Sequence, residues 1–307
     1  MQISRRALWH IPLVLMSIAV LLPLVFMLAT ALAEPETGLK YGASLREIML
    51  PRTWHWENFA DVWRTAPFLR YYINSLVVAG FTTFGQVLMS ACAAYAFARI
   101  EWPGRDKVFF AYLATMMVPN SVTMIPNFIS MKFLPDLMQA LIPFINWTDY
   151  RYLGSFTEEN TVGRLVGLDS YFALIVPGVF SAYGTFLLRQ FLLGIPKELD
   201  EAAKIDGCTH WQIFTRIILP LARPGLVTLT LFTFMGTWSS FFWPLVTTTE
   251  DALRTLPLGL QSFQSQYGTE WHLVMAAALL MLIPVVILFL IGQNLLIKGL
   301  TVAAMKE

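Results

Sequence analysis

Three acidic side chains fall within four positions, Glu198, Asp200 and Glu201, and Asp206 follows them closely. They lie in a polar insert, residues 194–224, between two long apolar runs. Near the start of a helix such charges are stabilised by the helix dipole. Grouped carboxylates could also serve as general acids and bases or as metal ligands, provided that an apolar pocket or suitably spaced histidines accompanied them.

The sequence lacks those companions. The histidines are scattered and have no metal-ligand spacing: His10, His55, His210 and His272. No Gly-Lys dipeptide occurs, which excludes a P-loop lysine and with it a self-contained ATP site. No serine lies in a nucleophile elbow, and no paired carboxylates share an apolar setting. We therefore expect no catalytic residue, no metal site and no cofactor bound by this chain, so that energy must come from another chain.

The insert is predicted to form a helix, an elbow and a second helix. A mostly apolar face of the first helix is formed by Leu199, Ala202, Ala203 and Ile205. Gly207 breaks this helix, because glycine adopts the left-handed C-terminal conformation most readily. Thr209 and Gln212 have the spacing of a capping box, which starts the second helix. Its buried side is expected to hold Trp211, Phe214, Ile217 and Ile218, and its end is expected at Pro220 and Pro224.

Composition places the chain in a membrane. Of its 307 residues, 56% are hydrophobic, and the mean hydropathy is +0.59. A soluble domain needs a more polar surface than this composition allows. The net charge of +1 and the absence of a basic run give no support to nucleic-acid binding. Cys92 and Cys208 are expected on different levels of the molecule, so we predict no disulfide.

Six apolar stretches are long enough to cross a bilayer. The predicted spans are residues 11–33, 74–98, 108–131, 171–193, 225–246 and 272–297. Outside the spans lie an N-terminus (1–10), an external segment (34–73), a short basic loop (99–107), an external insertion (132–170), the polar insert (194–224), an external loop (247–271) and a tail (298–307). The first span is interpreted as an uncleaved anchor, although Ala31-Leu32-Ala33 resembles the cleavage site of a signal peptide.

Lysine and arginine predict the orientation of these spans. With both termini on one side, twelve of the 21 basic residues fall in the segments on that side, and the other nine are spread over longer loops. Basic residues concentrate on the cytoplasmic side of membrane proteins. Both termini and the insert are therefore expected to be cytoplasmic.

One pattern in the insert is similar to that of a known family. The pattern is Glu-Ala-Ala, then three residues, Gly, nine residues and Ile-x-Leu-Pro. The residues that match it are Glu201, Ala202, Ala203, Gly207, Ile217, Leu219 and Pro220. This resembles the EAA loop of the permease subunits of binding-protein-dependent ABC importers. The resemblance implies an all-α membrane protein with six transmembrane helices and the type I ABC importer permease fold, whose core would be residues 74–297.

The resemblance also implies partners and roles. The helix around Glu198–Asp206 would be a coupling helix that docks into a groove of an ATPase subunit, where ATP and Mg would bind. A second permease, two ATPase subunits and an extracytoplasmic sugar-binding protein would complete the complex in the inner membrane, surrounded by lipid. Glu201 would contact the ATPase or brace the elbow, and Ala202 and Ala203 would permit close approach. The residues assigned to coupling are Glu198, Glu201, Ala202, Ala203, Asp206, Gly207, Ile217, Leu219 and Pro220.

Looser matches are similar to the carbohydrate-uptake branch, in particular to the shorter permease of maltodextrin and multiple-sugar systems. They are Asn74-Ser75, Trp243-Pro244-Leu245, residues 256–260, Gln293 and residues 299–301. Two features depart from the family pattern. Trp238-Ser239-Ser240 stands where Trp-Asn and an acid are usual, and the 132–170 insertion is longer than the usual external turn. The insertion is either a feature that reaches a binding protein or an ornament.

Aromatic residues of the fifth span have two interpretations. Aromatic rings bind the C–H faces of sugars, so a substrate pathway could be lined by Phe234, Trp238, Phe241, Phe242 and Trp243. Helix packing or an interfacial belt would use the same residues.

Two other classes of protein stay open. An ion-coupled carrier usually needs an ionisable group at membrane depth, and no predicted span has one in its interior. A membrane scaffold would use the insert only to recruit a partner. Among ABC importers, a glycerol-phosphate or another polar solute could replace the di- or oligosaccharide that the resemblance favours.

Overall fold

The computed structural model describes residues 5–34, 53–145, 147, 150–152, 162–265 and 268–304. Two compact units divide the chain: residues 1–69 with 259–284, and residues 70–258 with 285–307. Residues 35–52 of the predicted external segment 34–73 lie outside the described residues, as do 146, 148–149 and 153–161 of the insertion 132–170.

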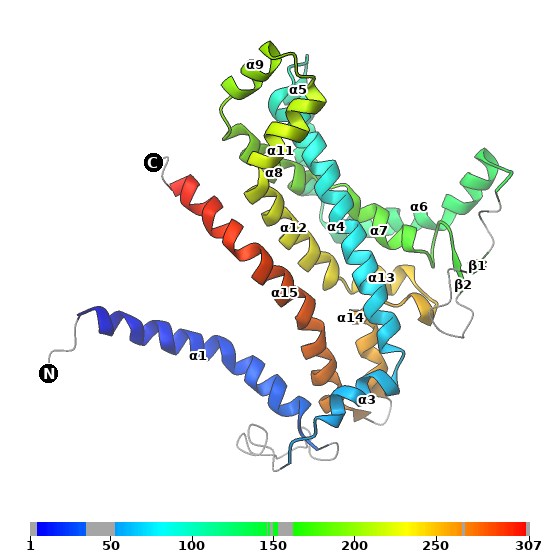
Figure 1. The fold of residues 1–307 in the computed structure, drawn as a ribbon. Coiled ribbons are helices and arrows are strands. Elements are labelled where there is room, and N and C mark those ends of the chain that lie inside the picture. Colours follow the sequence, from blue (N-terminus) through cyan, green and yellow to red (C-terminus); the bar gives the residue numbers. More distant parts are fainter. Residues whose placement is uncertain are drawn as a thin grey trace. The chain divides into compact units, whose positions relative to one another are not determined.

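The first unit is built on two helices, α1 (Arg5–Ala31) and α3 (Glu57–Thr65), both shown in Figure 1. Asn58 holds the end of α1, because its Nδ2 donates to the carbonyl oxygens of Ala31 and Ala33, each at 2.9 Å. Trp63 packs edge-on against Phe68 with ring centroids 4.9 Å apart. The other elements of this unit are η4 (Leu260–Phe263), the antiparallel strands β3 (Gln264–Ser265) and β4 (Gly268–Thr269), and the start of α15 (Trp271–Ala304).

The second unit holds most of the helices. Its elements, in chain order, are α4 (Phe68–Arg99), α5 (Arg105–Ala114), η1 (Thr115–Met117), α6 (Asn120–Leu141), β1 (Tyr150–Tyr152), β2 (Val162–Arg164), α7 (Tyr171–Val179), α8 (Ala182–Leu193), α9 (Glu198–Ile205), α10 (His210–Ile213), the π turn η2 (Phe214–Ile218), α11 (Leu219–Leu221), α12 (Arg223–Trp238), α13 (Phe242–Thr247), η3 (Asp251–Leu253) and α14 (Leu256–Gly259). The strands β1 and β2 pair antiparallel.

Three helices have the length and apolar composition to cross a membrane: residues Pro12–Ala31 of α1, Phe68–Arg99 of α4 and Trp271–Gln293 of α15. Three bent pairs meet the same criteria when each pair is taken together. They are α5–η1 with α6, α7 with α8, and residues His210–Leu221 with α12, bent by 97°, 41° and 77°. If each bent pair crosses once, the described residues contain six spans.

The predicted span 108–131 is two helices in the structure. Val118 is extended (φ −82°, ψ 116°) and Pro119 follows it, so α6 begins at Asn120. The ring of a proline disfavours helical geometry at the residue before it, which explains the break. The helix α6 then continues to Leu141, so the predicted boundary at residue 131 is wrong.

Other predicted boundaries also shift. The stretch 171–193 is interrupted at Ser181, whose Oγ accepts a hydrogen bond from the N–H of Gly184 at 3.0 Å and so caps α8. The stretch 225–246 is divided between α12 and α13. The helices α4 and α15 run past residues 74 and 297, to Phe68 and Ala304. A helix ends where its backbone hydrogen bonds end, and in these two helices the bonds continue beyond the apolar stretch that defined the predicted span.

Small residues let α4 lie close to α7 and α8. A Cβ atom on Gly184 would come within 2.5 Å of Ser90 Oγ, and one on Gly178 would come within 2.7 Å of Thr82 Cγ2. Close approach over small residues is characteristic of helices that pack within a membrane. The ends of α4 and α8 are thereby brought to the same place, where the insert follows.

Candidate functional site

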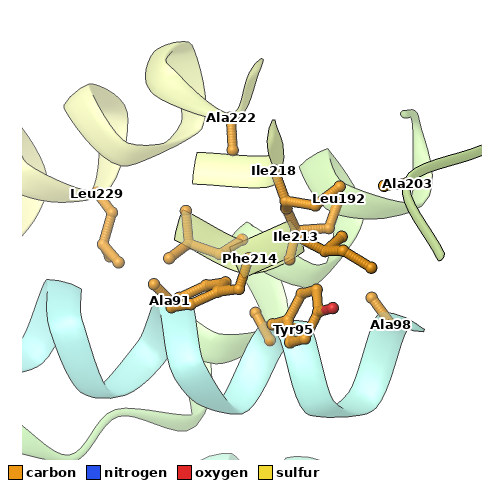
Figure 2. Packing of buried hydrophobic residues seen from close by; sticks show 12 residues of the cluster. Ala91, Tyr95, Ala98, Leu192, Ala203, Ile213, Phe214, Ile218, Ala222 and Leu229 are labelled. Atoms are coloured by element: carbon orange, nitrogen blue, oxygen red, sulfur yellow. The ribbon is translucent and has the colours of Figure 1, made fainter. Parts of the chain in front are cut away.

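The insert shares one apolar core with the helices around it. In Figure 1, α9 and α11 lie at the same end of α4 as α5. The buried cluster at this end draws on α4, α8, α12 and the insert, and Figure 2 shows its residues: Ala91, Ala94, Tyr95, Ala98, Leu188, Leu192, Ala203, Ile213, Phe214, Ile218, Ala222 and Leu229. The rings of Tyr95 and Phe214 meet with centroids 5.0 Å apart. The insert is therefore packed onto the helices that flank it.

The elbow has the two local devices predicted for it. Gly207 has φ +82°, in the left-handed region, as expected. Its N–H donates to Lys204 O at 3.0 Å and the next N–H, of Cys208, donates to Ala203 O at 2.9 Å, which together form a Schellman motif. The capping box is also present: Thr209 Oγ1 accepts from Gln212 N at 3.3 Å, and Gln212 Oε1 accepts from Thr209 N at 2.8 Å.

The second helix buries most of the side expected, with one exception. Phe214 and Ile218 are fully buried and Ile217 is half-buried. Trp211 was expected on this side, but 64% of it is exposed, so that prediction is wrong. Ile213 occupies the buried position near the cap instead, and the ring of Trp211 only contacts that of Phe214 at 5.6 Å.

Pro220 was expected to end this helix, and that prediction is wrong. The helix instead widens just before Pro220. The N–H of Leu219 bonds to Phe214 O, five residues back, which makes residues Phe214–Ile218 a π turn. Proline has no N–H, and its ring clashes with the carbonyl four residues earlier, so a wider turn removes the conflict. The helix runs on to Leu221, and the 77° bend into α12 comes at Ala222.

The predicted apolar face of α9 is divided between two sides. Ala203 is 5% exposed and belongs to the cluster, so the expectation that it shares one face with Leu199, Ala202 and Ile205 is wrong. Leu199 and Ile205 are 41% and 86% exposed. The assigned residues that share their exposed side are Glu198, Glu201, Ala202 and Asp206. The helix therefore presents a mixed acidic and apolar surface outward.

An arginine that the sequence analysis missed holds α9 from the inside. Arg99 Nη1 donates to Asp200 Oδ2 at 3.1 Å, and its Nη2 donates to the carbonyl oxygens of Leu192 and Ile195, each at 2.7 Å. The side chains of Arg99 and Asp200 are 3% and 12% exposed. From the sequence alone, Asp200 is one of several charges near a helix start that the dipole stabilises. The available signal was that Asp200 lies three residues before Ala203, on the same side of the helix.

A second arginine ties α8 back to α4. Arg189 Nε donates to Phe97 O at 3.3 Å, and its guanidinium lies 4.3 Å from the centre of the Phe109 ring. Arg99 reaches from α4 to the end of α8, and Arg189 reaches from α8 to the end of α4. The two contacts run in opposite directions across the same junction.

The candidate pathway aromatics differ in their surroundings. Trp238 is buried, stacked on Phe234 at 5.5 Å and set edge-on to Tyr72 at 5.7 Å. Trp243 Nε1 donates to Ala173 O at 2.8 Å. Phe241 meets Phe242 edge-on, and Phe242 is 70% exposed. Trp238 thus has a packing role within the subunit, and pathway lining stays a prediction for the group.

Two further sequence expectations concern thiols and metals. Cys92 and Cys208 are free thiols, and both pack against the cluster. Within the part of the chain that the structure describes, no three His, Cys, Asp or Glu side chains are grouped so that they could hold a metal.

Known proteins are similar to this chain over most of its length. A family model described as binding-protein-dependent transport system inner membrane component matches residues 86–302. The chain is 30% identical over 293 residues to the arabinooligosaccharides transport system permease protein of Bacillus subtilis (strain 168), which covers 95% of this chain and 92% of that protein. It is 32% identical over 300 residues to the sn-glycerol-3-phosphate transport system permease protein of Escherichia coli O1:K1 / APEC, with 95% and 94% covered.

A solved structure has the same fold. A chain in the crystal structure of a bacterial ABC transporter involved in the import of the acidic polysaccharide alginate aligns with a TM-score of 0.73 and 20% identity, over 96% of this chain and 98% of that one. This chain accordingly has the type I ABC importer permease fold, and it belongs to the family of inner membrane components of binding-protein-dependent transport systems.

Proposed function

We propose that this chain is a permease subunit of an ATP-driven ABC importer and that it moves a sugar, in particular a di- or oligosaccharide, across the inner membrane. The observation that carries the proposal is the division of α9 into two sides. One side is locked into the subunit by Ala203 and Asp200, and the other presents exposed apolar and acidic side chains. Leu199, Ala202 and Ile205 are exposed together on that side, and an apolar surface made of several residues suits a covered interface.

The exposed side of α9 would dock into a groove of an ATPase subunit. Ala202 is small enough to allow close approach, and Ile205 supplies an apolar contact. Glu198 and Glu201 lie beside them and would make charge-assisted hydrogen bonds with donors of the ATPase. ATP and Mg would be bound by that partner, because this chain has no P-loop lysine. Hydrolysis would accordingly belong to the partner and transport to this chain.

Displacement of α9 would then reach the membrane helices through the shared core. The cluster joins α9 and the second helix of the insert to α4, α8 and α12. A close-packed core transmits displacement because its side chains have no room to move independently. Movement of the ATPase pair would therefore tilt these helices and switch the access of the substrate cavity from one side of the membrane to the other.

The substrate class is argued from the relatives and from charge. Relatives with similar sequences are named for arabinooligosaccharides and for sn-glycerol-3-phosphate. A phosphate group is usually bound by arginine or lysine. Residues 224–247, which contain the candidate pathway aromatics, include no charged residue. This favours an uncharged sugar over a glycerol-phosphate.

The complete transporter would contain further chains. A second permease would complete the pathway, two ATPase subunits would supply energy, and an extracytoplasmic sugar-binding protein would deliver the substrate. Both termini and the insert would face the cytoplasm, where the ATPases are. The family name supports the binding-protein partner, since it describes binding-protein-dependent transport.

The test is to tag this chain, extract it gently from its native membrane and identify the proteins that copurify. The purified complex is then placed in vesicles with ATP, and uptake of a labelled oligosaccharide is compared with uptake of labelled glycerol 3-phosphate. Copurification of a second permease and an ATPase, with hydrolysis stimulated by a sugar-loaded binding protein, supports the proposal. Uptake that survives ATP removal but collapses with the ion gradient would indicate a secondary carrier, and no flux would indicate a scaffold.

A matched pair of variants tests the docking side of α9. Ile205→Glu places a charge in the proposed interface and should abolish copurification of the ATPase. Leu141→Glu introduces the same charge at another exposed aliphatic residue, which is 65% exposed at the end of α6 and lies outside the insert. It should leave the ATPase bound. Retention of the ATPase by Ile205→Glu would contradict the proposed docking side.

A further inference from the structure

Arg99 joins three helices at one point. It is the last residue of α4, and its guanidinium contacts a carbonyl oxygen in the last turn of α8, at Leu192, one in the connection that follows, at Ile195, and a carboxylate in the first turn of α9. The bonds to Leu192 O and Ile195 O are 2.7 Å long, and the bond to Asp200 is 3.1 Å long. Three hydrogen bonds from one planar group fix the positions of their acceptors relative to one another.

Burial gives these bonds more weight than a surface ion pair has. Only 3% of the Arg99 side chain and 12% of the Asp200 side chain are exposed. Exposed ion pairs contribute little because water and salt screen them, and a buried pair is screened much less. The helix ends add to the attraction, because a cation is favoured at the C-terminus of α8 and an anion at the N-terminus of α9.

The connection that Arg99 bridges is short. Between the end of α8 at Leu193 and the start of α9 at Glu198 the chain has residues 194–197, including Gly194. A short connection of this kind can absorb rotation of one helix against the next through its backbone dihedral angles. Arg99 bonds to acceptors on both sides of it, at Leu192 and at Asp200. Arg189, which donates to Phe97 O, closes the same junction from α8 to α4.

We propose that Arg99 is a positioning residue for energy coupling: it makes α9 move as one body with α4 and α8. A push on α9 then tilts the membrane helices, whereas without Arg99 the 194–197 connection absorbs part of the push. This inference rests on the proposed function, since it concerns how ATP hydrolysis on a partner is converted into transport. Arg99 touches neither the solute nor the ATP in this account.

The experiment uses the complete transporter in vesicles and measures ATP hydrolysed per sugar transported. The variants are Arg99→Gln, Asp200→Asn and the two combined, and Lys197→Gln is the matched control. Lys197 lies in the same connection and pairs with Glu101 at 3.8 Å, but both side chains of that pair are mostly exposed. Asp200→Asn keeps the shape of the side chain and an acceptor oxygen while removing the charge.

We expect Arg99→Gln and Asp200→Asn to lower the sugar transported per ATP by about tenfold, which is the effect of one charge-assisted hydrogen bond on an equilibrium. The double variant should be no worse than Arg99→Gln alone, because Arg99→Gln already removes the charged contact that Asp200→Asn weakens. Lys197→Gln should keep the wild-type ratio. Parallel loss of hydrolysis and transport, with the ratio unchanged, would overturn the inference, because it would mean that Arg99 only supports folding.

An exchange of the two charges separates the bridge from a simple ion pair. In Arg99→Asp with Asp200→Arg, the new carboxylate would face the carbonyl oxygens of Leu192 and Ile195, and acceptors cannot bond to one another. We therefore expect no recovery of the coupling ratio. Full recovery would overturn the bridging role and leave only an attraction between two charges.

A distance measurement keeps the inference testable if a variant assembles poorly. Spin labels at Glu101, just after α4, and at Lys204 on α9, both exposed, report the separation of the two elements. Arg99→Gln should broaden the distance distribution relative to the wild type, and Lys197→Gln should not. An unchanged distribution overturns the inference. If the wild-type complex itself shows no ATP-driven uptake, the proposed function fails. If the wild-type complex takes up sugar and the variants behave as it does, this inference alone fails.

Discussion

Substitution of Gly207 isolates the backbone cost of the elbow from any steric cost. Its φ is +82°, and a Cβ atom at this position would have no neighbouring atom within 4 Å. A new side chain therefore has space, and the penalty comes only from the left-handed conformation. That penalty is roughly 1–2 kcal/mol for an ordinary residue and smaller for asparagine, whose side chain can hydrogen-bond locally. A β-branched residue is the least suited to positive φ.

These values predict an order of effects rather than a single result. A cost of about 1–2 kcal/mol reduces the population of the native elbow relative to alternatives by a factor of about 5–30. We expect ATPase binding and uptake to fall in the order wild type, Gly207→Asn, Gly207→Ala, Gly207→Val, while the amount of protein inserted in the membrane stays constant. The assay is titration of the ATPase onto the permease pair in nanodiscs, with uptake measured in parallel.

One result would refute this reasoning. If Gly207→Val is inserted normally, binds the ATPase as tightly as the wild type and supports normal uptake, then the Schellman motif is not required for coupling. Equal losses for alanine and asparagine would also contradict the conformational explanation, because it depends on their different tolerance of positive φ.

Three further changes test local contacts through the thermal unfolding of the purified permease. Thr209→Ala removes the capping box and should destabilise the protein by about 1 kcal/mol. Gly225→Ala places a Cβ atom 2.6 Å from the ring of Phe191 and should destabilise it by about 1–3 kcal/mol through overpacking. Asn74→Asp replaces an amide that donates to Ala252 O and Arg254 O, each at 2.9 Å, with an acceptor. It should cost about 1–3 kcal/mol, because Arg254 O loses this donor, whereas Ala252 O keeps the bond from Arg70 Nε at 3.1 Å.

Two of these changes have a control of the same chemistry. Thr215→Ala removes a hydroxyl that bonds to Trp211 O within its own helix, and should have little effect. Gly236→Ala adds a methyl group to α12 where nothing lies within 4 Å, and should be neutral or stabilising. If a control lowers the unfolding temperature as much as its test variant does, the contact assigned to that variant is not the cause.

Features fixed by neighbouring residues were predicted well. Gly207 and the pair Thr209 and Gln212 determine local hydrogen bonds through their own chemistry, so their spacing is sufficient to predict them. The family and its fold were likewise predictable, because the EAA pattern covers both local devices and the apolar flanks. The composition of the spans was informative for the same reason, since each span is a property of a continuous stretch.

Features that depend on distant partners were not predicted. The two sides of α9 differ because Asp200 meets Arg99 from α4, and nothing near Asp200 in the sequence announces that partner. At Pro119 the proline itself indicates a break in the helix. The 97° angle of the bend is not indicated, because it depends on the packing of the flanking helices. Trp211 was placed wrongly because a helix of a few residues has too little periodicity to define its buried side.

The π turn has a consequence for the spacing of the insert. Successive residues on a helix are about 100° apart around the axis, and this turn carries one residue more than an α turn would between the same bonds. The π turn thus already holds the one extra residue that this stretch absorbs, and deletion of one residue there would leave an α turn with its flanks in nearly the same orientation. A further residue added between Thr209 and Pro220 would instead rotate everything after it by about 100° relative to the cap. Ile218 and Leu229 would then turn away from α4, although no side chain had been altered. A residue added in this stretch should therefore be far more damaging than one added between residues 132 and 170.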